Sequence, residues 1–374
     1  MSSVRAIAKR LNVSIATVSR ALNNHPEINP ETSAKVLKAA NEIGYFSAVG
    51  RRITTNIGFV SSSDADFYEY DALLLAGIRR GLSQHKFDVT IISLERDKTE
   101  SESYTQFFLR KGVRGVIVQT LARNRHIPPV IASEGFPIVV VADRFEDNPN
   151  ISYISYHSGE GSRRAVEHLI HLGHNRIALA MHIERDSDHA DRYQAYKQAL
   201  LNNGIEPEPD LVVPVIADIN GGISAMNRLM SLPNPPTAIY FTDPLTTVGA
   251  MRRAYAMGLR VPDDISIIGF DDSDMRYRVY PPLTAVCQNA TNLGTEAGLW
   301  LTQKLLNMND EPMRKVATTF FEVNQTTGLP PRKRVRILPD GTRIELEDGG
   351  AATTSAALAG TIVANGNGGT LGVT

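Results

Sequence analysis

The stretch NVSIATVSRALNN, residues 12–24, places hydroxyl and guanidinium groups on the exposed side of a short predicted helix, where Glu and Lys are more usual. These side chains, Thr17, Ser19 and Arg20, are hydrogen-bonding groups without negative charge. They lie in a basic segment, because residues 1–55 carry eight Lys or Arg and three Asp or Glu. The segment's net charge of +5 leaves about −6 on the rest of the chain. A basic head on an acidic body indicates a nucleic-acid-binding module attached to another kind of domain.

A second group of candidate residues follows the first predicted strand, in the loop SSSDADFYEYD at 61–71. Its Ser62, Asp64, Phe67 and Tyr70 combine polar groups with aromatic faces, which suit the hydroxyl edges and apolar CH faces of a sugar. Ligands of open α/β sheets bind at the carboxyl ends of the strands. Asp143 has such a position at the end of the fourth predicted strand.

Two histidine-containing stretches, HIERDSDHAD at 182–191 and HLIHLGH at 168–174, raise the question of a metal site. In the second stretch His168 and His171 share a helix face, but His174 comes after a helix-ending glycine. The three side chains therefore cannot converge easily, and we expect no bound metal. An enzyme on a doubly wound fold is a further alternative, but no G-x-G-x-x-G follows the first strand and neither a P-loop nor a G-x-S-x-G motif occurs, so we expect neither an enzyme nor a cofactor.

Compartment signals are consistent with a cytoplasmic protein. Cys287 is the only cysteine, so no disulfide can form within the chain and a Cys-based zinc site is excluded. The N-terminus lacks the apolar segment of a signal peptide. No apolar run approaches the roughly 20 residues of a membrane span.

The first 45 residues predict three short helices. The first covers about residues 4–11, and the second starts after Ser14, a good N-cap. The third opens with Asn29 as N-cap and Pro30 at the first helical position, and ends at Gly44.

From Thr55 onward, short apolar runs alternate with amphipathic helices. The runs NIGFV, DVTIISL, GVIVQ and PIVVVAD are typical of parallel strands buried on both faces. A second series follows with RIALAM, LVVPVIA, AIYFT and ISIIGF. The fold class is therefore α/β, with two doubly wound parallel sheets side by side. The late strand TAVCQ and the helix NLGTEAGLWLTQKLL are expected to return to the first sheet.

The C-terminal region has a different composition. PPRKRVRILPDGTRIELEDG predicts a small hairpin that turns at Asp340-Gly341. Residues 349–374 carry no charge and consist mostly of Gly, Ala, Thr and Asn, so we expect them to be disordered.

Several segments resemble a known family in order and spacing. VRAIAKRLNVSIATVSRALNNHPEINPETSAKVLKAANEIGY resembles the N-terminal helix-turn-helix of LacI/GalR-type repressors. The body segments RAVEHLIHLGHNRIAL, DRYQAYKQAL, GLRVPDDISIIGFDD and YPPLTAV resemble the same family. The resemblance covers about residues 3–328. It implies a DNA-binding headpiece, a hinge, and a periplasmic-binding-protein-like core of two subdomains that binds an effector and dimerises.

The resemblance assigns the second helix to the major groove, with its N-terminal residues at base edges. Ile15, Ala16 and Arg20 then face the bases, and Arg20 can reach guanine or a phosphate. Small hydroxyl residues such as Thr17 and Ser19 can approach phosphates closely. The complete set of expected DNA-binding residues is Ser14, Ile15, Ala16, Thr17, Ser19, Arg20, Asn23, Tyr45, Arg51 and Arg52.

The hinge departs from the family pattern. Tyr45 is present, but Ser47 and Ala48 stand where the family has Pro and Asn, and no minor-groove leucine follows. Arg51 and Arg52 are either an arm that contacts phosphates or the minor groove, or only a basic linker.

In the core, the resemblance adds effector-binding candidates. Arg192 stands where the family has an effector-binding arginine, and Asp271 where it has a ligand-binding carboxylate. Thr242 and Asp243 replace the usual Asn-Asp. The alternative for each is structural: Asp243 and Asp272 as helix caps, Arg192 on a helix surface, Asp271 as a packing residue. The complete set of expected effector-binding residues is Ser62, Asp64, Phe67, Tyr70, Asp143, Arg192, Thr242, Asp243 and Asp271. His174 is structural by the same resemblance.

The sequence predicts a non-enzymatic, sequence-specific transcription regulator, a repressor that binds a palindromic operator as a homodimer. A small-molecule effector, a sugar or sugar derivative, binds between the subdomains; the alternatives are a solute-binding protein and a purine- or nucleoside-responsive regulator with the same core. Because the family-like core ends near Gly328, we expect deletion of residues 332–374 to leave folding intact.

The predicted domains are a headpiece at 1–46, a hinge at 47–55, a core at 56–328 and a tail at 329–374. Within the core, subdomain one covers about 56–155 and 285–312, and subdomain two covers about 156–284 and 313–328.

Overall fold

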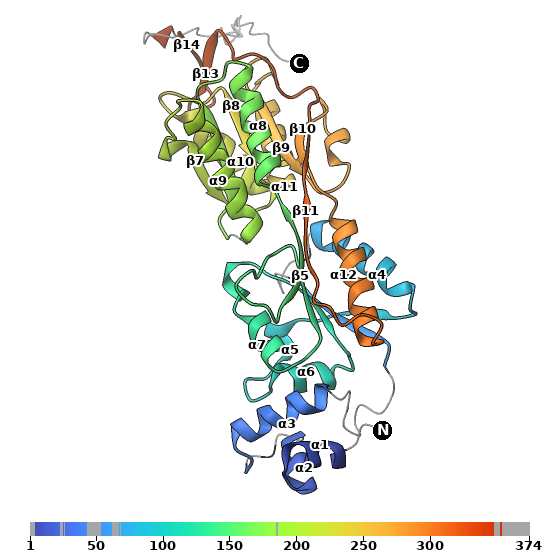
Figure 1. The fold of residues 1–374 in the computed structure, drawn as a ribbon. Helices are drawn as coiled ribbons and strands as arrows, with labels where there is room; N and C mark the ends of the chain where they lie inside the picture. The colour runs from blue at the N-terminus through green and yellow to red at the C-terminus, as the bar shows by residue number, and fades with distance from the viewer. Residues whose placement is uncertain are drawn as a thin grey trace, which may run out of the picture.

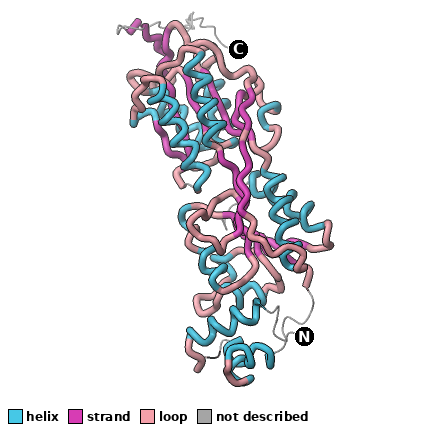
Figure 2. Tube along the Cα trace, in the orientation of Figure 1, coloured by secondary structure: helices cyan, strands magenta, loops and turns pink. Residues whose placement is uncertain are grey.

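The structure is a computed structural model that describes residues 4–22, 25, 27–42, 54–61, 67, 69–184, 186–347 and 352–353. A three-helix unit lies at one end of the molecule, and two α/β subdomains follow along its length (Figure 1). Strands form the centre of each subdomain, and helices cover them (Figure 2).

The N-terminal unit consists of α1 (Val4–Leu11), α2 (Ile15–Leu22) and α3 (Pro30–Glu42). Ile7, Val18 and Val36, one from each helix, are fully buried in a common core. Asn29 begins α3 as predicted, because its Oδ1 accepts the Glu31 N–H at 2.8 Å. The predicted end at Gly44 lies outside the described residues. The spacing of apolar residues thus places the three helices correctly.

The first subdomain contains a six-stranded parallel sheet of order β11-β5-β4-β3-β1-β2. Two apolar clusters cover its two faces, one under α4 and α12 and the other under α6 and α7. Burial on both faces explains the near-continuous apolar runs. Its elements are β1 (Asn56–Val60), α4 (Glu69–Ser83), β2 (Asp88–Ile91), α5 (Leu94–Asp97), α6 (Tyr104–Arg110), β3 (Val116–Gln119), α7 (Ile127–Ser133), β4 (Ile138–Val141), β5 (Ser152–His157), α12 (Ala290–Leu305) and β11 (Arg314–Thr318).

The second subdomain repeats this plan with the order β12-β10-β9-β8-β6-β7, in which β12 alone is antiparallel to its neighbour. Helices α8 and α9 cover one face, and α10 and α11 the other. Its elements are α8 (Gly159–His171), β6 (Ile177–His182), α9 (Ser187–Asn202), β7 (Val212–Val215), α10 (Ile219–Ser231), β8 (Ala238–Phe241), α11 (Pro244–Ala256), β9 (Ser266–Asp271), β10 (Thr284–Cys287) and β12 (Phe320–Glu322). The prediction of two doubly wound sheets is confirmed.

The sheet membership of two late strands was predicted wrongly. The strand TAVCQ does not return to the first sheet, because β10 pairs in parallel with β9 of the second. Residues 314–318, assigned to the second subdomain, form β11 and pair with β5 of the first sheet. An apolar run identifies a buried strand, but its partner depends on pairing that the run does not encode. The chain therefore crosses between the subdomains after β5, after β10 and between β11 and β12.

The C-terminal hairpin exists as predicted. Strands β13 (Lys333–Ile337) and β14 (Arg343–Glu347) pair antiparallel, and Gly341 in the turn has a φ of +87°. The short β15 (Ala352–Thr353) adds to β14. The other residues of the predicted disordered end, 349–351 and 354–374, lie outside the described residues.

The hairpin packs on the second subdomain, which argues against the expectation that residues 332–374 can be deleted without effect on folding. Val335 and Ile337 are 3% exposed and belong to the apolar cluster under α10. Arg336 donates to the Ser231 carbonyl at 3.0 Å, and Arg343 forms an ion pair with buried Asp264 at 3.1 Å. Sequence likeness to a family that ends near Gly328 could not reveal this contact, because the hairpin lies beyond the likeness.

Candidate functional site

The exposed face of α2 carries four of the ten expected DNA-binding residues, and Ser14 lies directly before the helix. The Ser14 Oγ accepts the Thr17 N–H at 2.9 Å and lies 2.8 Å from the Thr17 hydroxyl, so the two side chains fix the start of the helix. Ile15 is 49% exposed, so its apolar side chain is accessible to a partner. The Arg20 guanidinium lies 3.5 Å from Glu27.

The structure brings part of this predicted set together. Ser14, Ile15, Ala16, Ser19 and Arg20 are exposed on or beside α2, and Thr17 is half-buried. Four predicted residues lie outside the described residues: Asn23, Tyr45, Arg51 and Arg52. The hinge alternatives therefore stay predictions.

A cavity of about 360 Å³ lies between the two subdomains and is lined by both. Tyr70 of α4, Gln119 of β3 and Tyr156 of β5 line it from the first subdomain. The second subdomain contributes side chains from α9 and from the loops after β6, β8 and β9. These include Glu184, Asp186, Asp188, His189, Arg192, Asp243 and Asp272.

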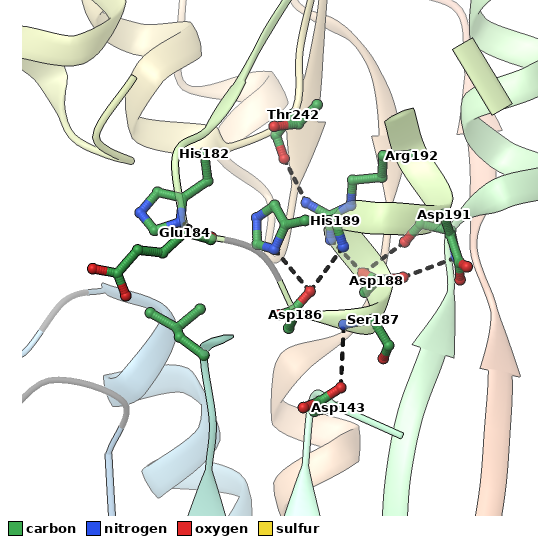
Figure 3. Close-up of polar contacts among 12 residues, drawn as sticks. Asp143, His182, Glu184, Asp186, Ser187, Asp188, His189, Asp191, Arg192 and Thr242 are labelled. Atoms are coloured by element: carbon green, nitrogen blue, oxygen red, sulfur yellow. Dashed lines mark hydrogen bonds and ion pairs between the residues drawn. The ribbon is translucent and has the colours of Figure 1, made fainter. Parts of the chain in front are cut away.

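His189 forms the centre of a charge network on the second wall. Its Nδ1 lies 2.8 Å from Asp186 and its Nε2 lies 3.1 Å from Asp243 (Figure 3 shows the Asp186 contact). Burial alone would lower the pKa of His189, but the two carboxylates outweigh burial and raise that pKa to about 10. The imidazolium is therefore charged at neutral pH and neutralises part of the acidic wall.

Arg192 lies one turn further along α9 and is 4% exposed. Its guanidinium donates to Asp188 and, at 2.5 Å, to the Thr242 carbonyl, and it lies 3.6 Å above the Phe270 ring centroid. Asp188 also accepts the Ser158 N–H at 2.9 Å, which ties α9 to the start of α8. Among the described residues, the Arg192 Nε has no hydrogen-bond partner. Arg192 is thus held rigidly while one donor stays unused.

The two aspartates after β9 have different surroundings. Asp271 is fully buried, and it accepts from the Arg276 guanidinium at 2.7 Å and the Ser273 N–H at 3.1 Å. It does not line the cavity. Asp272 does, and burial raises its pKa to about 7, although Gln288 donates a hydrogen bond to it. Asp272 therefore lines the cavity at this strand end and Asp271 does not, so a contact between Asp271 and a ligand stays a prediction that this conformation does not favour.

Asp143 joins the subdomains at the side of the cavity. It accepts from Thr120 at 2.8 Å, from Arg125 at 2.9 Å and from the Ser187 N–H at 3.1 Å (Figure 3 shows the last contact). Because these donors occupy its carboxylate, Asp143 is a structural link in this conformation and not a lining residue.

Of the predicted effector residues, Tyr70, Arg192 and Asp243 line the cavity. Thr242 is buried beside it, and Phe67 is 46% exposed and is not among its lining residues. Ser62 and Asp64 lie outside the described residues. Asp243 precedes α11, but its side chain makes no capping hydrogen bond there, so the helix-cap alternative fails.

Sequence reasoning missed Gln119, His189 and Asp272 as lining residues. Gln119 could have been predicted as a lining residue, because it ends the buried strand GVIVQ and strand ends face the cleft. His189 precedes Arg192 by three residues and so shares its helix face. The rule that ligands bind at the carboxyl ends of strands applies equally to the adjacent Asp271 and Asp272, so it could not identify Asp272 as the lining residue.

His174 makes structural contacts. His174 is 1% exposed and lies 2.8 Å from the Thr237 hydroxyl and 3.1 Å from that of Ser266. Within the residues that the structure describes, no group of three or more His, Cys, Asp or Glu side chains could hold a metal ion.

Comparison with known proteins identifies the family. Residues 3–47 match the model for bacterial regulatory proteins of the lacI family, and residues 166–324 match that of a periplasmic binding protein-like domain. The probable HTH-type transcriptional repressor ExuR of Bacillus subtilis (strain 168) is 32% identical over 324 residues, which are 84% of this chain and 94% of that protein. This chain belongs to the LacI family.

Other LacI-family proteins are similar over comparable lengths. The HTH-type transcriptional regulator CelR of Thermobifida fusca is 27% identical over 333 residues, 87% of this chain and 98% of that protein. The structure of a CelR–cellobiose complex is 27% identical with a TM-score of 0.63, and the match covers 87% of this chain and all of that one. A LacI-family regulator from Enterococcus faecium with bound ribose, 23% identical with a TM-score of 0.64, shares the fold.

The protein is therefore a DNA-binding transcriptional repressor of the LacI family, with a helix-turn-helix headpiece and a periplasmic-binding-protein-like effector domain. Family membership confirms the prediction of a regulator and excludes the enzyme alternative. In the described part of the chain, none of the helices has the length and apolarity needed to cross a membrane.

Proposed function

We propose that this LacI-family protein is a sugar-responsive repressor, in which a sugar or sugar derivative occupies the cavity between the subdomains. One observation carries the proposal: a single cavity of about 360 Å³ is lined by both sheets. A ligand that touches both walls binds the closed core better than the open one. That difference in affinity is the only way in which it can shift the population.

The chemistry of the cavity supports a sugar. Tyr70 and Tyr156 offer aromatic faces for apolar CH groups, and Asp272 and Gln119 offer oxygen acceptors for hydroxyls. The similar CelR protein has been solved with cellobiose. The same two tyrosines would also stack on a nucleobase, so a nucleoside remains the second candidate.

We infer further that the protein binds a palindromic operator as a homodimer. One headpiece reads few bases, and a two-fold dimer places two recognition helices about 34 Å apart, one helical turn of DNA. Closure of the cleft would change the spacing of the two headpieces through the segments at 47–55. Linkage then requires that sugar and DNA alter each other's affinity by the same factor, about 5- to 150-fold.

The proposal is tested in two steps. A thermal-shift screen over neutral sugars, sugar acids and nucleosides identifies a ligand, and a gel-shift titration on operator DNA then measures its effect. Tyr70→Ala should remove the ligand response and leave ligand-free DNA binding intact. Tyr255→Ala is the matched control, because Tyr255 is 87% exposed and does not line the cavity. A full ligand response in Tyr70→Ala would place the effector elsewhere.

A separate substitution tests the predicted contact with DNA. Arg20→Ala should cost about 1–3 kcal/mol of specific binding and relax one base position of the operator. Unchanged operator affinity in this variant would contradict the placement of α2 in the major groove.

A further inference from the structure

The cavity has an excess of negative charge. Among the described lining residues, seven are carboxylates and three are cations. The carboxylates are Glu69, Asp71, Glu184, Asp186, Asp188, Asp243 and Asp272, and the cations are Arg123, His189 and Arg192. An anionic ligand therefore enters a site whose wall already repels it, and the low dielectric of a closed cleft strengthens that repulsion.

Each of the three lining cations is already paired with protein carboxylates. Arg123 contacts Glu184 at 2.9 Å, across the cleft from the first subdomain to the second. Arg192 contacts Asp188, and His189 lies between Asp186 and Asp243. A ligand carboxylate would have to displace one of these partners and leave a buried carboxylate without its cation, which is costly.

The groups left without partners at the cavity are suited to a hydroxyl. The Gln119 Oε1 and the Arg192 Nε are buried and have no hydrogen-bond partner among the described residues. The first is an acceptor on β3 of the first subdomain, and the second is a donor on α9 of the second. Sugar hydroxyls can donate to the first and accept from the second, whereas a carboxylate can only accept. An unsatisfied buried polar atom is unfavourable, so a ligand that satisfies both is favoured.

We propose that the effector is an uncharged polyhydroxy compound, a neutral sugar, and that the carboxylates of the cavity select against the corresponding sugar acid. This inference rests on the proposed function and narrows it. Selection of this kind depends on repulsion of the wrong ligand as much as on attraction of the right one.

The test is calorimetric titration of the full-length protein with matched pairs at pH 8.0: D-glucose and D-glucuronate, D-galactose and D-galacturonate, cellobiose and cellobionate. At this pH Asp272, with a pKa of about 7, is mostly ionised. In the pair that binds, we expect the neutral sugar to bind at least about tenfold more tightly than its acid. Equal or tighter binding of the acid overturns this inference, but the proposed function of a sugar-responsive repressor then still holds. Binding by no member of the panel, in a protein that binds a nucleoside in the thermal-shift screen, contradicts the proposed function itself, and this inference with it.

Two variants distinguish the effect of a carboxylate in the cavity from the effect of the protein's total charge. Asp272→Asn removes one lining carboxylate and should reduce the preference for the neutral sugar several-fold. Glu206→Gln makes the same change of charge at an exposed residue that does not line the cavity, and should leave the preference unchanged. An equal reduction in both variants would show that the cavity carboxylates do not select the ligand.

Discussion

The two subdomains share a scaffold but differ at the surfaces that face the cleft. In each, a pair of helices packs through glycines against the partner's backbone: Gly77 of α4 against α12, and Gly222 of α10 against α11. At the cleft, the strand ends of the first sheet present uncharged Gln119, Ser155 and Tyr156. The second wall presents a network of buried ion pairs around α9. The duplicated architecture therefore sets the fold, and the side chains at the strand ends set what can bind.

The second subdomain differs again at its far end, where the hairpin covers the apolar cluster under α10 (Figure 1). Deletion of residues 333–374 should cause the largest effect. Burial of an aliphatic side chain is worth roughly 1.5–3 kcal/mol, so loss of Val335 and Ile337 should lower the free energy of unfolding by about 4 kcal/mol. Urea unfolding measures this loss. A deletion of residues 354–374 alone is the control and should have little effect. A stable 333–374 deletion would show that the hairpin contributes nothing to the second subdomain.

His189→Gln tests whether the charged wall depends on its imidazolium. The variant leaves Asp186 and Asp243 without their cation and should lose about 3 kcal/mol of unfolding free energy near pH 6. Because the pKa of His189 is raised from 6.5 to about 10, its contribution is complete below pH 6.5 and is lost as pH rises toward 10. The difference between wild type and variant, measured by urea unfolding, should therefore shrink between pH 6.5 and 10. A difference that does not vary with pH would contradict the charged state of His189.

Two glycine substitutions examine the shared scaffold. In Gly77→Ala the new Cβ would overlap the Thr291 carbonyl oxygen, and in Gly222→Ala that of Thr246. Each helix pair must then separate, at a cost of about 2 kcal/mol. We expect similar losses of melting temperature in the two variants, so that each is a control for the other. A large loss in only one would show that the two subdomains do not use the same packing.

Local sequence patterns predicted many elements of this molecule. The pairing of strands that lie far apart in the chain could not be predicted from such patterns. The headpiece helices follow from Ser14, Pro30 and the apolar spacing, because caps and periodicity act within a few residues. The sheet membership of β10 and β11 depends on partners far along the chain, so it could not be derived from either run. Asp271 and Asp272 are adjacent, and the sequence does not show that the Arg276 guanidinium and nearby backbone N–H groups occupy Asp271 while Asp272 lines the cavity.

Gln119→Leu should have the smallest effect on stability and a specific effect on binding. The substitution removes a buried acceptor that has no partner among the described residues, so the free energy of unfolding should change by no more than about 0.5 kcal/mol. If a sugar hydroxyl donates to that oxygen, the affinity for the neutral sugar should fall about tenfold, because an apolar side chain cannot replace the bond. Gln119→Asn keeps the amide on a shorter side chain and should retain part of the affinity.

Calorimetry and urea unfolding on the same samples separate the effect on affinity from the effect on stability. A loss of stability above about 1 kcal/mol would show that Gln119 supports the first sheet. Unchanged affinity in a stable variant would show that Gln119 does not contact the ligand.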